Sequence, residues 1–193
     1  VKVIIREWMF MGALMVAAGC GGPSDIPTAA KYVKKILVGI VFDSGGRGDK
    51  SFNDSAYAGI ERAEKDFGIE VKSVESKSEK DYEPNLTALA EAGCDLIIGV
   101  GINMKASIEA VWVSFPDKKF AIVDAPVMAP NVRAILFKEE EGSFLAGYLA
   151  GLMTTTNKIG FVGGLELGLI KKFPAGYEAG GKAANPDRRV LPA

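Results

Sequence analysis

Short apolar runs alternate with amphipathic segments along the chain from residue 35 onward, and this alternation leaves few possible folds. The first run, residues 36–42, is apolar and rich in β-branched residues, as in a strand that is buried on both faces. In the segment after it, Phe52, Ala56, Ile60 and Ala63 recur at helical spacing. The pattern predicts strands at 36–42, 69–74, 95–100, 119–123, 132–137 and 158–162, and helices at 51–67, 84–92, 104–113 and 139–153.

This order of elements indicates an α/β fold. Strands that alternate with helices over short connections form a parallel sheet with helices on both faces. In such folds ligands bind at the carboxyl ends of the strands. Asp43, the turn 99–103 and Asp124 each follow a predicted strand directly, so we expect a polar site there.

Composition narrows the classes of function. A hydrophobic content of 48% with 24% charged residues is typical of a folded core. The net charge of −1 provides no general attraction to nucleic acid, so no nucleic-acid partner is expected. The chain has no histidine, which removes the commonest general base and most zinc sites. We therefore expect no catalytic residue, no metal and no cofactor.

The two cysteines have different settings. Cys94 begins an apolar run and is expected to be a small buried side chain. Cys20 follows a segment with Lys2 and Arg6 and then an uncharged stretch, 8–18, which is the pattern of an export signal. No disulfide framework is indicated.

Residues 16–20, Val-Ala-Ala-Gly-Cys, resemble a bacterial lipobox. This resemblance implies a signal peptide at 1–20, lipidation at Cys20, and a mature protein held at the cell membrane by the lipid, facing the periplasm or the extracellular space. Residues 21–34 are turn-rich and polar, as in a flexible tether.

Two glycine-rich turns partly resemble nucleotide-binding motifs but lack their defining residues. Residues 46–51 lack the Gly-Lys-Ser/Thr of a phosphate-binding loop, and Asp49 would repel a phosphate. Residues 99–104 lack the third glycine of a dinucleotide fingerprint. Both are interpreted as strand-to-helix turns, with Ser51 as the expected N-cap of the helix 51–67.

Several long motifs resemble one family in the correct order: segments 42–59 (FDSGGRGDKSFNDSAYAG), 115–124 (FPDKKFAIVD), 137–150 (FKEEEGSFLAGYLA) and 158–164 (KIGFVGG). The resemblance spans about residues 35–186 and is to the basic membrane protein family of lipoproteins. These are substrate-binding proteins of ABC transporters and include purine nucleoside receptors.

The resemblance implies a periplasmic-binding-protein-like fold of type I, with two lobes that close on a ligand. Residues 35–164 would be the first lobe, and 165–193 the crossover and the start of a second lobe whose remainder is missing. A family helix matches 173–180, where Pro174 favours a late start or a kink. The partners that the resemblance implies are a small-molecule ligand of the purine nucleoside class and an ABC permease.

The resemblance also implies roles for four residues. Asp43 and Asn53 would hydrogen-bond the nucleoside, Phe52 would stack on its base, and Asp124 would hold its polar groups. A base offers a flat π-face to an aromatic ring, and ribose hydroxyls are donors suited to carboxylates. The structural alternatives are that Asp43 braces the glycine-rich turn, Phe52 packs in the core, and Asp124 caps the next segment.

Three alternative interpretations stay open at this point. The protein could be a ligand-sensing receptor or regulator, because these share the fold. It could be an enzyme in which Asp43 and Asp49 surround a metal, or a non-functional truncated remnant of a binding protein. Because ligand burial in two-lobed receptors comes from both lobes, we expect this chain alone to bind weakly or not at all.

Overall fold

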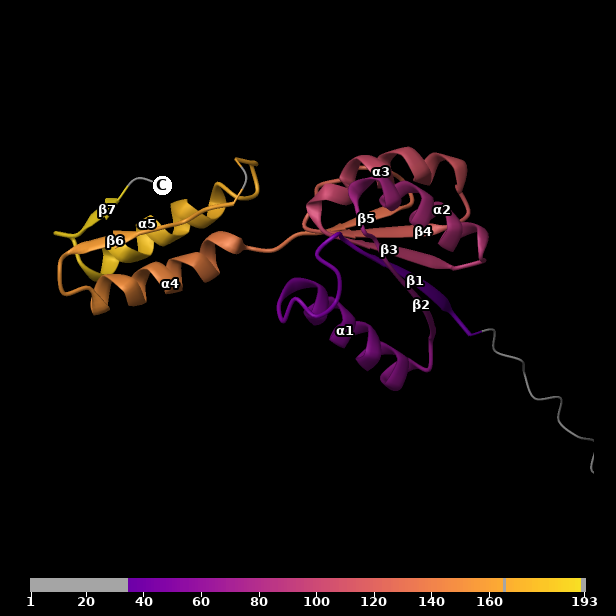
Figure 1. Cartoon of the computed structure of the whole chain (residues 1–193), viewed down its shortest axis with the longest axis horizontal. Helices are drawn as coiled ribbons and strands as arrows, with labels where there is room; N and C mark the ends of the chain where they lie inside the picture. The colour runs from indigo at the N-terminus through magenta and orange to yellow at the C-terminus, as the bar shows by residue number, and fades with distance from the viewer. Residues whose placement is uncertain (1–34, 165, 192–193) are drawn as a thin grey trace, which may run out of the picture. The chain divides into compact units, whose positions relative to one another are not determined.

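The computed structural model describes residues 35–164 and 166–191 (Figure 1). The expected signal peptide, Cys20 and the tether lie outside the described residues. Five parallel strands form one sheet in the order β2-β1-β3-β4-β5: β1 (Leu37–Phe42), β2 (Glu70–Glu75), β3 (Leu96–Val100), β4 (Lys119–Val123) and β5 (Val132–Ile135). The α/β class predicted from the sequence is therefore confirmed.

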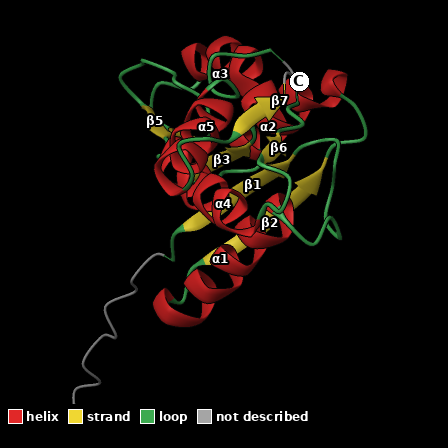
Figure 2. Ribbon diagram, turned by 90° about the vertical axis from the view of Figure 1, so that its left-hand side faces the viewer, coloured by secondary structure: helices red, strands yellow, loops and turns green. Residues whose placement is uncertain are grey.

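Helices cover both faces of this sheet: α1 (Phe52–Phe67) on one, and α2 (Tyr82–Glu91) and α3 (Lys105–Val111) on the other (Figures 1 and 2). β1 contributes to both layers because successive side chains point to opposite faces. Ile40 and Phe42 pack with Ile60 of α1, whereas Val41 joins the larger core beneath α2 and α3.

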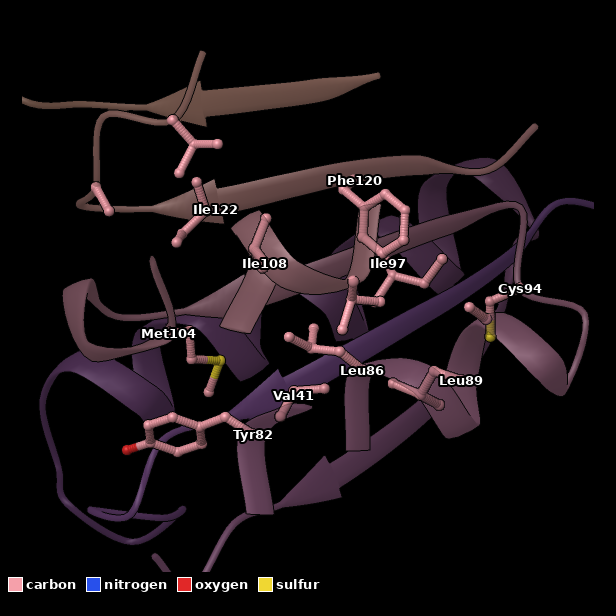
Figure 3. Close-up of a cluster of buried hydrophobic side chains, with 14 residues drawn as sticks. Val41, Tyr82, Leu86, Leu89, Cys94, Ile97, Met104, Ile108, Phe120 and Ile122 are labelled. Atoms are coloured by element: carbon pink, nitrogen blue, oxygen red, sulfur yellow. The ribbon is translucent and has the colours of Figure 1, made fainter. Parts of the chain in front are cut away.

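The larger core contains Tyr82 and Leu86 of α2, Ile108 of α3, and strand residues that include Ile97 and Phe120 (Figure 3). Cys94 is fully buried in the same cluster, as expected, and its thiol is free. This core fixes the positions of the strands, and so of the loops that follow their carboxyl ends.

After β5 the chain forms α4 (Glu139–Met153), β6 (Lys158–Gly160), α5 (Lys172–Ala184) and β7 (Arg189–Leu191). Glycines on the two helices let their backbones touch: a Cβ on Gly180 would overlap the carbonyl of Phe144, and one on Gly147 that of Tyr177. Ser143 Oγ also donates to the carbonyl of Phe173 at 2.6 Å.

Three local features differ from the sequence predictions. β7 was not predicted, and β6 pairs with β7 in a separate two-stranded parallel sheet rather than with the strands before it. Ser51 occupies the N-cap position of α1, as predicted, but its side chain makes no capping hydrogen bond. Pro174 causes no late start, because α5 begins at Lys172 and its first turn tolerates proline.

The described part of the chain includes no helix with both the length and the apolar character required to cross a lipid bilayer.

Candidate functional site

The loop between β1 and α1 is held by the carboxylate of Asp49. It accepts hydrogen bonds from the amides of Ser51 at 2.9 Å, Asn53 at 2.9 Å and Asp54 at 3.1 Å. These bonds, the Asn53 amide first, lower the pKa of Asp49. The Asp49 carboxylate therefore accepts the capping hydrogen bonds from the first amides of α1 that were expected to go to the Ser51 side chain.

Two further contacts brace the same loop. Asp54 accepts from the amides of Gly48 at 2.7 Å and Lys50 at 2.8 Å. Arg47 donates to Glu75 of β2 at 2.8 Å, and its guanidinium carbon lies 4.6 Å from the ring centre of Tyr57. The loop is therefore preorganised by bonds to itself, to β2 and to α1.

Asp43, Phe52 and Asn53 are brought together at the carboxyl end of β1. Asn53 Nδ2 donates to Asp43 Oδ1 at 2.8 Å, and the same oxygen accepts from the Gly45 amide at 2.9 Å. Gly101 follows β3 with φ of 110°, and a Cβ there would lie 3.2 Å from Asp43 Oδ2 and 3.7 Å from the Phe52 ring. The predicted turn 99–103 therefore lies next to Asp43 and Phe52 of the predicted site.

Asn53 is the most enclosed of these residues. It is only 2% exposed, and its Oδ1 has no hydrogen-bond partner. Asp43 accepts hydrogen bonds both from its own turn and from Asn53, so it braces the glycine-rich turn, the structural alternative to ligand binding.

Asp124 lies at the carboxyl end of β4 in a left-handed backbone conformation, φ 66°, which aspartate adopts more readily than most residues. Its amide donates to the Ile135 carbonyl at 2.9 Å, and its buried Oδ1 has no partner. Burial, and then the charge of Glu139, raise the pKa of Asp124, while Lys172 opposes them. Such a strained, unpaired carboxyl is characteristic of functional sites.

A pocket of about 510 Å³ joins these elements. Phe52, Asp124 and Glu139 line it together with Ser55, Ala56, Val100, Val123, Ile135 and Phe137. Asp43 and Asn53 do not line it, although Asn53 is next to Phe52 in the chain. The structure therefore places two of the four predicted residues in this pocket and the other two beside it.

Glu139 was missed by the sequence analysis as a site residue. It begins the run Glu139-Glu-Glu141, which was interpreted only as a complement to the dipole of α4. Its ion-pair partner, Lys172, lies on α5 more than thirty residues later in the chain, so no local pattern distinguishes it from Glu140 and Glu141.

A larger pocket, about 620 Å³, lies between α4 and α5 and is lined mainly by apolar residues and glycine, with Glu140 and Glu141 at its edge. It includes none of the residues at the carboxyl ends of the sheet strands. Its position on the helices separates it from the candidate site.

A parallel α/β sheet with an aromatic ring and unpaired polar oxygens at its carboxyl edge is an arrangement suited to binding a small solute. The model of the family "ABC transporter substrate-binding protein PnrA-like" matches residues 36–191. The chain therefore belongs to this family of ABC transporter substrate-binding proteins.

Similarity to individual proteins supports this assignment. An uncharacterized lipoprotein of Pyrococcus abyssi is 41% identical over 181 residues, covering 89% of this chain and 44% of the relative. An ABC transporter nucleoside-binding protein of Lactococcus lactis is 31% identical over 194 residues, covering 98% and 55%.

The crystal structure of an ABC transporter solute-binding protein from Aeropyrum pernix superposes with a TM-score of 0.73 at 32% identity. It covers 80% of this chain and 46% of that protein. The periplasmic-binding-protein-like fold is thus confirmed for the part compared. The chain spans about half the length of these relatives.

Proposed function

We propose that this protein is a lipid-anchored receptor that captures a purine nucleoside and delivers it to an ABC permease. The observation that carries the proposal is the pocket in which the Phe52 ring and the unpaired Asp124 carboxyl lie together. The family assignment supports the transport role, and the lactococcal relative, which is named a nucleoside-binding protein, supports the ligand class.

Each group has a definite part in this proposal. Phe52 is half-buried and offers a ring face on which a base stacks. Asp124 Oδ1 and Asn53 Oδ1 accept hydrogen bonds from donors of the ligand, and each currently lacks a partner. Asp43 orients Asn53 by accepting from its Nδ2, and Asp49 Oδ2 accepts from the same nitrogen at 3.4 Å, so the amide oxygen of Asn53 is left for the ligand.

Binding is tested by adding guanosine, adenosine or free ribose to the isotope-labelled whole chain in detergent micelles and recording amide resonances. We expect weak, saturable shifts at Phe52, Asn53 and Asp124 with the nucleosides only, because half of a two-lobed site leaves one ligand face in water. Phe52→Ala should abolish the shifts. Unchanged spectra at millimolar nucleoside would contradict the proposed function for this chain.

The membrane anchor is tested separately. We expect Cys20→Ser to abolish incorporation of labelled palmitate and to release the chain from the membrane fraction of a bacterial host, whereas Cys94→Ser should do neither. The name of the Pyrococcus relative, a lipoprotein, supports this expectation. Equal labelling of the Cys20→Ser variant would refute the anchor.

A further inference from the structure

Among the described residues, the buried side-chain atoms at or beside the pocket that lack a hydrogen-bond partner are all acceptors. Asn53 Oδ1, Asp124 Oδ1 and Glu139 Oε1 are buried and have no partner among the described residues. The nearby side-chain donors are already used. Asn53 Nδ2 donates to Asp43 at 2.8 Å and to Asp49 at 3.4 Å, and Ser55 Oγ donates to the Ser51 carbonyl at 2.6 Å. Unpaired buried acceptors are costly, so they favour a ligand that supplies donors.

Glu139 is the best defined of these acceptors. Its side chain is only 6% exposed, although it occupies the first position of α4. Oε2 accepts from Lys172 Nζ at 2.9 Å, and the other carboxylate oxygen is left without a partner in a residue that lines the pocket. The ion pair holds the side chain in place, and the second oxygen is free for a ligand.

The ion pair also determines the charge of Glu139. Burial works to raise the pKa of this carboxyl, but the Lys172 ammonium and nearby backbone amides outweigh it and lower the pKa. Lys172 Nζ lies 3.7 Å from Glu140 as well, and it donates to the Phe137 carbonyl at 3.4 Å. Lys172 is therefore a positioning residue that keeps Glu139 ionised and oriented.

We infer that Glu139 is a further ligand-binding residue, and that together with Asp124 it selects a ligand edge that carries hydrogen-bond donors. This inference rests on the proposed function. Among purines, guanine presents a ring N–H beside an exocyclic amino group, and a carboxylate can accept from both. The corresponding ring nitrogen of adenine is an acceptor, which a carboxylate repels.

The test compares dissociation constants of guanosine and adenosine for the whole chain, measured from resonance shifts. We expect guanosine to bind at least about tenfold more tightly, the discrimination typical of a site whose buried polar groups would otherwise be unpaired. Glu139→Gln should reduce this ratio several-fold. The matched control is Glu141→Gln, on the same helical turn but exposed and paired with Lys138, which should leave the ratio unchanged.

The outcomes separate the two proposals. Nucleosides that bind without preference, or equal ratios in Glu139→Gln and Glu141→Gln, would overturn the inference and leave the proposed function standing. No binding of any nucleoside would overturn both.

A second measurement, on the wild-type chain, tests the inference if the Glu139→Gln variant fails to fold. In the wild-type chain, carbon-13 carboxyl resonances of Glu139 and Asp124 should both shift on addition of guanosine, and those of Glu141 should not. A Glu139 resonance that stays fixed while that of Asp124 moves would overturn the inference.

Discussion

At the scale of single residues, the structure separates polar side chains with unpaired oxygens from those whose oxygens hold a loop in place. Asn53 and Asp124 have unpaired oxygens, whereas the carboxylate of Asp49 is saturated by backbone amides. Aspartate therefore has two roles in the structure: Asp49 holds the loop between β1 and α1, whereas Asp124 after β4 keeps an unpaired oxygen. Within the described part of the chain, the two carboxylates differ in how many hydrogen-bond donors lie within reach: three backbone amides for Asp49 and none for Asp124 Oδ1.

Asp49→Asn should destabilise the protein, because the uncharged amide accepts less strongly from the three backbone amides and loses its attraction to the start of α1. We expect a lower urea midpoint at neutral pH. Asp66→Asn, at the exposed end of α1, is the control and should shift the midpoint less.

The pH dependence of this effect has a definite sign. The pKa of Asp49 is lowered below its ordinary value of 3.8, so its stabilisation is fully present above that value and is lost as the pH falls through the still lower folded pKa. The wild type and Asp49→Asn should therefore approach each other in stability in strong acid. A constant difference down to that pH would contradict the role of the charge.

At the scale of elements, the association of α4 with α5 depends on the absence of side chains. Gly147 and Gly151 of α4 and Gly176 and Gly180 of α5 approach backbone atoms of the opposite helix. Glycine normally weakens a helix by about 1 kcal/mol relative to alanine. Here the close approach that it permits compensates for that cost.

Gly180→Ala should therefore destabilise the α4–α5 pair, by about 1–3 kcal/mol as in other overpacked interfaces, because its Cβ would overlap the Phe144 carbonyl. Gly142→Ala in α4 is the matched control: a Cβ there meets nothing within 4 Å, and the better helix former should stabilise slightly. Urea denaturation followed by circular dichroism measures both. Equal stability of the two variants would refute the packing argument.

At the scale of the whole molecule, the chain carries apolar surface that a single isolated domain rarely exposes. On α4, Leu145 is 69% exposed, and Leu149 and Leu152 are each 60% exposed. The relatives are about twice as long. Contiguous apolar surface of this kind is associated with interaction sites or aggregation.

The purified chain should consequently self-associate with rising concentration. Sedimentation velocity in detergent-free buffer, on a Cys20→Ser chain produced without lipid, should show oligomers that Leu149→Glu combined with Leu152→Glu converts to monomer. Leu191→Glu, at an apolar position of β7 that is only 43% exposed, serves as the control. A monomer at all concentrations would contradict this prediction.

Much of the fold was predictable because its determinants are local. The apolar runs placed all five strands of the main sheet, and Gly68 ends α1 in the left-handed conformation that favours glycine. The short strand β7 was missed because its three residues carry no periodicity; its partner β6 lies about thirty residues earlier in the chain.

The candidate site, like the fold, has some features that the local sequence predicts and others that depend on the tertiary structure. The sequence by itself determined the α/β architecture, the carboxyl edge at which Asp43, Phe52, Asn53 and Asp124 collect, and the family motifs that contain them. Only the tertiary structure decided which polar atoms are used internally and which stay free, because that depends on where donors from the same loop and from distant segments come to lie. Asp49 binds amides of its own loop, whereas Glu139 is buried and held by Lys172, a partner that strand and helix patterns do not reveal.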